Sequence, residues 1–114
     1  DPNCPLSFAK QDFCASLTWT KQATDEEKGE FTLRFWKKSE GTKNGPYVSP
    51  GQTVFVKLWM PSMGHGSPNN VDPVASGQGH YKGKVNFTMT GDWQIKVYLQ
   101  KNGVTDSTYF DLIF

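Results

Sequence analysis

The fold class is decided by the segment Thr53-Val54-Phe55-Val56-Lys57-Leu58-Trp59-Met60. Every second residue of this segment, from Val54 to Met60, is aliphatic or methionine, and the residues between them include Thr53 and Lys57. Successive side chains of a β-strand point to opposite faces, so residues at every second position share one face. The segment therefore predicts a strand with one face on a hydrophobic core and the other face toward solvent.

The same alternation recurs along the rest of the chain, in runs of about five to ten residues rich in β-branched and aromatic types. Turn signals separate the runs, among them Asn44-Gly45-Pro46 and Thr90-Gly91-Asp92. We expect six clear strands and short further ones near Val71–Ala75 and Tyr81. The fold class predicted is all-β, a single immunoglobulin-like antiparallel β-sandwich of about seven strands over residues 1–114. The other long runs cover residues 13–20, 31–36, 85–89, 93–99 and 107–114.

Length and charge exclude several classes of protein. The chain has 114 residues, which suits one domain, and 36% of them are hydrophobic, which suits a folded chain. The apolar stretches are too short to span a bilayer, so we predict no membrane-spanning segment. Of the 12 basic residues only Arg34 is an arginine, and the net charge is +1. Nucleic acid is therefore not expected as a partner.

The two cysteines, Cys4 and Cys14, match no zinc-binding spacing. A pair this close favours a disulfide formed in an oxidising compartment, although two independent reduced thiols remain the alternative. Such a bond would tie down an N-terminal extension over residues 1–12, and would stabilise the fold by about 3 kcal/mol in the chain-entropy model. The chain begins at Asp1 without an initiator methionine, which we expect of a processed, secreted protein.

The segment that carries chemistry is Met60-Pro61-Ser62-Met63-Gly64-His65-Gly66-Ser67. A β-turn centred on its Pro-Ser pair would bring the Cα atoms of Met60 and Met63 within about 7 Å of each other. Two thioethers and the imidazole of His65 form a soft donor set, which suits Cu(I) and hardly suits Mg²⁺, Ca²⁺ or structural Zn²⁺. The segment predicts a Cu(I) site.

His80 is the second of two histidines. It follows a long loop that we expect to start at Gly64. A loop that leaves and rejoins one end of a sandwich would bring its own ends together. His80 is therefore included as a fourth candidate ligand beside Met60, Met63 and His65.

Three segments together resemble a known family. They are Leu58-Trp59-Met60-Pro61-Ser62-Met63-Gly64-His65-Gly66, then Gly79-His80-Tyr81, then Val85-Asn86-Phe87-Thr88-Met89-Thr90-Gly91-Asp92-Trp93-Gln94-Ile95. The resemblance is to YtkA-like or FixH-like domains and covers about Phe31 to Leu99. It implies an immunoglobulin-like sandwich in a periplasmic or otherwise extracytoplasmic protein, often lipid- or membrane-anchored in its full-length precursor. It also implies copper handling, with a copper-accepting or copper-donating extracytoplasmic protein as the partner.

Several residues have a structural interpretation beside the functional one. Met60 continues the inward face of its strand, so ligand and core are both open for it. Met63 and His65 lie outside the alternation and are expected to be ligands, whereas Met89 alternates with Phe87 and is expected in the core. Two tryptophans, Trp36 and Trp59, are expected on the outward faces of their strands.

These observations lead to two functional hypotheses from different classes. The first is a copper-binding protein that carries or buffers Cu(I) and is not an enzyme, because both histidines fall in one candidate site and no nucleophile elbow or phosphate loop is present. The alternative is a metal-free protein- or carbohydrate-binding sandwich in which the segment from Met60 to Ser67 is a structural loop and exposed aromatic side chains make the contacts.

Overall fold

The computed structural model describes residues 3–114, so the first two residues of the expected N-terminal extension lie outside the described part. Those residues form nine strands and no helix. The strands are β1 (Leu6–Ser7), β2 (Cys14–Lys21), β3 (Gly29–Trp36), β4 (Thr53–Met60), β5 (His65–Gly66), β6 (Val71–Gly77), β7 (His80–Val85), β8 (Asp92–Lys101) and β9 (Val104–Ile113).

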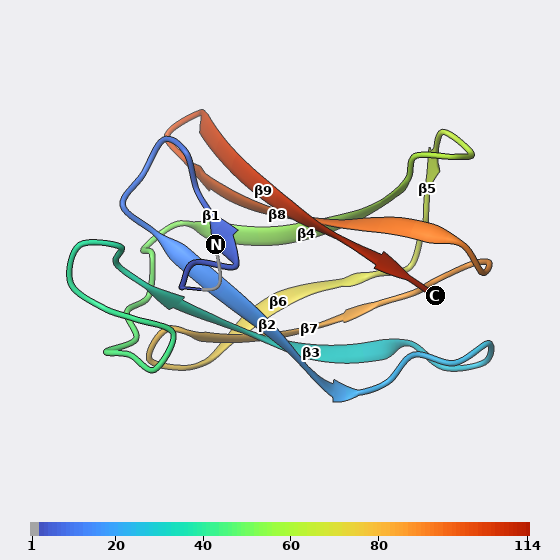
Figure 1. Cartoon of the computed structure of the whole chain (residues 1–114), viewed down its shortest axis with the longest axis horizontal. Helices are drawn as coiled ribbons and strands as arrows, with labels where there is room; N and C mark the ends of the chain where they lie inside the picture. Colours follow the sequence, from blue (N-terminus) through green and yellow to red (C-terminus); the bar gives the residue numbers. More distant parts are fainter. Residues whose placement is uncertain (1–2) are drawn as a thin grey trace.

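The strands form two antiparallel sheets packed face to face (Figure 1). One sheet has the order β1-β2-β3-β7-β6 and the other has the order β5-β4-β8-β9. The predicted all-β sandwich is thus confirmed. The strand count is higher than expected because β1 and β5, each only two residues long, are too short to show a period in the sequence.

The alternation in β4 separates buried side chains from outward ones, as the sequence predicts. Val54, Val56, Leu58 and Met60 are buried, and the residues between them face outward or are half-buried. Residues of the same kind from both sheets meet them between the layers, and their removal from water is the main stabilising contribution to such a fold. Besides these four, the core cluster contains Leu6, Phe8, Ala15, Phe31, Leu33, Phe35, Val85, Phe87, Trp93, Ile95, Val97 and Leu99.

The N-terminal extension is held by the predicted disulfide. Cys4 and Cys14 are bonded, with their Cα atoms 5.3 Å apart. Cys4 lies just before β1 and Cys14 is the first residue of β2, so the bond links the segment that leads into β1 to the start of β2. A disulfide of this kind is typical of proteins that fold in an oxidising compartment.

Trp36 departs from expectation. The alternation of β3 predicts an outward side chain, but Trp36 is 1% exposed. The chain after β3 folds back over it: a Cβ added at Gly41 would lie only 3.1 Å from the Trp36 Cβ. The expectation failed because a loop, and not the opposite sheet, covers this side chain.

Among residues 3–114 there is no helix that could cross a membrane.

Candidate metal centre

The segment from Met60 to His65 forms a tight hairpin between β4 and β5. The backbone N–H groups of Met63 and Gly64 both donate to the Met60 carbonyl, with N···O distances of 3.2 and 2.8 Å. Gly64 has φ of 66°, a left-handed conformation that glycine adopts without steric cost. The turn expected from Pro61 and Ser62 is therefore present, and it reverses the chain within four residues.

Met60 and His65 are direct partners in the β4–β5 ladder. Directly opposed residues of an antiparallel pair have their side chains on the same face, with Cβ atoms about 4.5–5.5 Å apart. Met60 is 1% exposed, and His65 is half-buried. The hairpin thus places one buried thioether beside one accessible imidazole.

The imidazole of His65 is oriented by two contacts. Its ring lies edge-on to the buried indole of Trp93, with ring centroids 6.0 Å apart. Its Nδ1 lies 2.9 Å from the Gly66 carbonyl oxygen. Because a carbonyl only accepts, Nδ1 carries the hydrogen in this bond and the Nε2 lone pair of the neutral ring is left for another ligand. Metal-binding histidines are commonly held in this way, by a carbonyl on the other ring nitrogen.

Met89 was expected in the core, and this expectation is wrong. Strand β7 ends at Val85, so the alternation does not continue to Met89, which lies in the connection to β8 and is 41% exposed. The Trp93 Nε1–H donates to the Met89 carbonyl at 3.0 Å and fixes this connection beside the hairpin. His65 lies near the sulfur atoms of both Met60 and Met89. The tight turn signal directly after Met89, at Thr90-Gly91-Asp92, could have indicated that the strand ends earlier.

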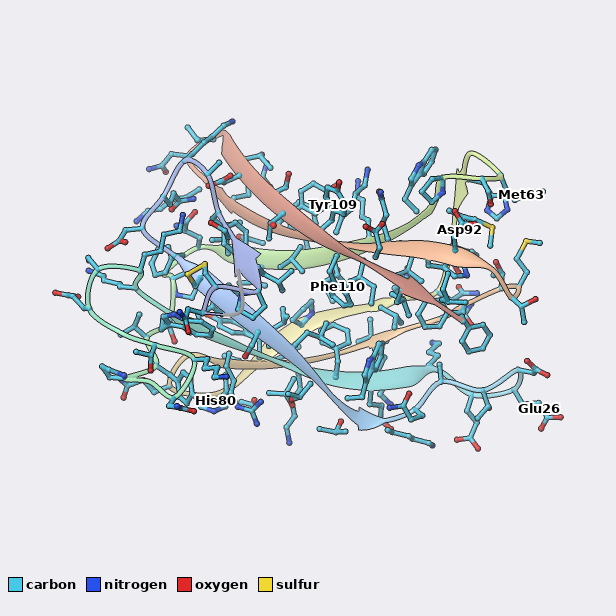
Figure 2. All side chains as sticks on the ribbon, viewed as in Figure 1. Glu26, Met63, His80, Asp92, Tyr109 and Phe110 are labelled. Atoms are coloured by element: carbon cyan, nitrogen blue, oxygen red, sulfur yellow. A yellow bond between two sulfur atoms is a disulfide. The ribbon has the colours of Figure 1, made fainter. Side chains whose placement is uncertain are left out.

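Met63 occupies the tip of the hairpin, at the same end of the sandwich as Asp92 (Figure 2). Its side chain is 58% exposed, so it is not packed against the core. A methionine side chain has three rotatable bonds and adapts to its surroundings at little cost. Met63 is therefore an exposed, adaptable thioether at the tip of the hairpin that carries Met60 and His65.

The sequence places Asp92 in a turn but does not mark it as a residue of the candidate site. The Ser62 hydroxyl, at the turn of the hairpin, donates to the Asp92 carboxylate. This hydrogen bond to the charged form lowers the pKa of Asp92 below its ordinary value of 3.8, and it outweighs the opposing effect of partial burial. Asp92 therefore ties the hairpin turn to the start of β8.

The fourth candidate ligand, His80, lies at the other end of the sandwich from Met63 (Figure 2). The expected loop between Gly64 and His80 contains strand β6, Val71–Gly77, which runs along the sheet before the chain turns into β7. A strand advances about 3.3 Å per residue, so seven residues carry the chain more than 20 Å. His80 packs instead edge-on against Tyr47, with ring centroids 5.0 Å apart, and its Nδ1 lies 2.8 Å from the Gln78 carbonyl oxygen.

The donors gathered at the hairpin end are three thioethers and one imidazole: Met60, Met63, Met89 and His65. Within residues 3–114, no three His, Cys, Asp or Glu side chains form a group that could hold a metal. Thioether and imidazole donors fit Cu(I) better than harder ions. The donors at this end therefore suit a soft metal ion.

The sequence model of the YtkA-like family matches residues 11–98, which is most of the chain. The chain belongs to the YtkA-like family. The matched range of this YtkA-like domain contains the hairpin, both histidines and Met89, while Cys4 and strand β9 lie outside it. Comparisons with curated proteins and with solved structures gave no significant match.

Proposed function

We propose that this YtkA-like domain binds Cu(I) at its hairpin end, through His65 and the thioethers of Met60, Met63 and Met89. The observation that carries the proposal is the direct pairing of Met60 with His65, with the Met89 sulfur near the same imidazole. Met89 replaces His80 as the fourth candidate ligand. His80 is not part of the proposed site, because it lies at the far end of the sandwich.

The accessibility of the donors supports a role in carrying or buffering the metal. Met60 is buried and His65 half-buried, so these two donors are fixed by the fold. Met63 and Met89 are 58% and 41% exposed, so they are open to a second protein. A site with fixed inner donors and accessible outer donors suits metal that is received from one protein and passed to another. We propose no catalytic turnover of a substrate at this end.

The disulfide supports a location outside the cytoplasm. Cytosolic thiols are kept reduced, so a structural bond between Cys4 and Cys14 is expected in a periplasmic or extracellular protein. In such a compartment the partner would be a copper-donating or copper-accepting extracytoplasmic protein.

The test is an anaerobic Cu(I) titration against a chromophoric Cu(I) chelator, performed on the parent protein and on two matched histidine variants. We expect His65→Ala to weaken Cu(I) binding by at least about tenfold, because loss of even a supporting partner of a metal ligand costs 10- to 100-fold. His80→Ala serves as the control and should bind like the parent. Equal binding by the parent and His65→Ala, or an equal loss in both variants, would contradict the proposed site.

A further inference from the structure

The outer face of the β4–β8–β9 sheet carries a group of aromatic and lysine side chains that the metal site does not use. We call it the aromatic–lysine face. In β4 and β8, Phe55 is paired with Tyr98, and Lys57 with Lys96. Tyr109 of β9, labelled in Figure 2 on the outer side of its strand, is paired with Lys96 and is 52% exposed. The face consists of Phe55, Lys57, Trp59, Lys96, Tyr98 and Tyr109.

Two positive charges are directly opposed at the centre of this face. Lys57 and Lys96 are cross-strand partners, and like charges in that position are destabilising. Each lysine leans toward a neighbouring ring: Lys57 Nζ lies 5.8 Å from the Tyr98 centroid, and Lys96 Nζ lies 5.5 Å from the Trp59 centroid. Neither forms one of the ion pairs found among residues 3–114. In the described part of the chain, the face therefore holds a pair of cations with no carboxylate within ion-pair distance of either one.

Three of the four rings already have a partner on one face, which argues against a sugar ligand. Phe55 and Tyr98 are stacked on each other, with centroids 4.7 Å apart and planes 5° apart. The lysine ammonium groups lie over Tyr98 and Trp59. Carbohydrate-binding platforms need free ring faces for the sugar to stack on. On Phe55, Tyr98 and Trp59 a sugar would have to compete with a stacked ring or with an ammonium group.

We propose that the aromatic–lysine face is a docking surface for a protein with an acidic surface. Carboxylates of such a partner would neutralise Lys57 and Lys96, and the aromatic side chains match the residue types enriched at the centres of protein interfaces. Asp111, paired with Gln94 beside the face, adds a negative charge at its margin. That charge disfavours an anionic membrane and suits the polar rim of a protein interface.

The aromatic–lysine face lies directly beside the hairpin that carries the candidate copper ligands. Trp59 is adjacent in sequence to Met60 and is paired with Gly66, the neighbour of His65. A partner seated on the face would thus lie next to the hairpin that carries the candidate copper ligands. The exchange of copper with that partner rests on the proposed function, whereas the docking itself is measured without metal.

The experiment is an NMR titration of the metal-free protein with a short synthetic peptide of alternating glutamate and tyrosine. We expect the amide signals of β4, β8 and β9 around the six residues of the face to shift. The double variant Lys57→Glu/Lys96→Glu should bind the peptide at least about tenfold more weakly, because the attraction between lysine and the peptide's glutamates is replaced by repulsion between carboxylates. Lys43→Glu/Lys82→Glu makes the same charge change at two exposed lysines outside the face that belong to none of the ion pairs found among residues 3–114; it is the matched control and should bind nearly like the parent.

Three results would overturn the inference. The first is equal loss of peptide binding in both double variants, which would indicate attraction by net charge alone. The second is a set of shifts elsewhere on the protein, or none at all. The third is binding through the same lysines to phosphatidylglycerol-containing vesicles but not to the peptide, which would make the face a membrane contact. Cu(I) titration of Lys57→Glu/Lys96→Glu should match the parent, so failure of the copper site and failure of the docking surface are distinguished.

Discussion

Met60 and His65 face each other across the β4–β5 ladder, and the backbone of one tight hairpin sets their spacing. The thioether belongs to the buried face of a core strand, and the imidazole lies at the sandwich surface against Trp93. No long-range loop closure is needed to bring the two together. The pairing of Met60 with His65 is thus a local product of the chain between residues 60 and 65.

Met60 and Met89 should differ in their contribution to the stability of the fold. Met60→Ala removes a side chain that is 1% exposed and should lower the free energy of unfolding by about 2–5 kcal/mol. Met89→Ala removes a side chain that is 41% exposed and should change the free energy of unfolding by no more than about 0.5 kcal/mol. Chemical denaturation of both variants measures the difference. A large loss in Met89→Ala would show that Met89 is a core residue after all.

Asp92 should stabilise the hairpin turn as long as it is ionised. Its pKa is lowered by the Ser62 hydroxyl, so the stabilisation is complete above the ordinary value of 3.8 and is lost as the pH falls through the lowered pKa. An NMR titration should show the Ser62 amide signal changing with a midpoint below pH 3.8.

The matched variants for this prediction are Asp92→Asn and Asp111→Asn. Asp92→Asn removes the charged acceptor and should speed hydrogen exchange at the Met63 and Gly64 amides, which close the turn. Asp111→Asn changes the same charge in β9 and should leave those amides unaffected. The role given to Asp92 fails if both variants exchange alike, or if the midpoint of the Ser62 titration lies at or above pH 3.8.

The disulfide should contribute measurably to stability. Cys4 and Cys14 are ten residues apart in the sequence, and in the chain-entropy model closing such a loop stabilises the fold by about 3 kcal/mol. Denaturation of Cys4→Ser/Cys14→Ser should show a loss of that order, and the intact mass of the unreduced parent should be two hydrogens below that of the reduced form. Two thiols that react freely in the native parent would contradict both the bond and the extracytoplasmic location argued from it.

The fold was predictable because the strands of this sandwich are amphipathic. In β4 the alternation of Val54, Val56, Leu58 and Met60 with polar and aromatic residues corresponds directly to the buried and outward faces. Trp36 shows the limit of this signal, since period two tells which face a side chain occupies but not whether a loop covers that face. The two-residue strands β1 and β5 are too short to produce a period at all.

The candidate site was predictable only where it is local. The turn between Met60 and His65 follows from adjacent residues, and the structure contains it. The placement of His80 depends on the path of the chain through β6, and that of Met89 on where β7 ends. Both are decided by pairing between strands distant in sequence, which periodicity does not report. Because the alternation was extended past the end of β7, Met89 was wrongly predicted to lie in the core. Because residues 64–80 were treated as one loop, His80 was wrongly predicted to lie at the hairpin end.

The most direct test of the copper site is an NMR titration of the protein, labelled at its methionine methyl groups, with Cu(I) under anaerobic conditions. The chain has three methionines and two histidines, so every candidate donor gives its own signal. We predict that the methyl signals of Met60, Met63 and Met89 and the ring signals of His65 shift together and stop shifting at one equivalent of Cu(I), while the ring signals of His80 stay in place. Methyl signals that do not move, or a shift of His80 equal to that of His65, would contradict the site.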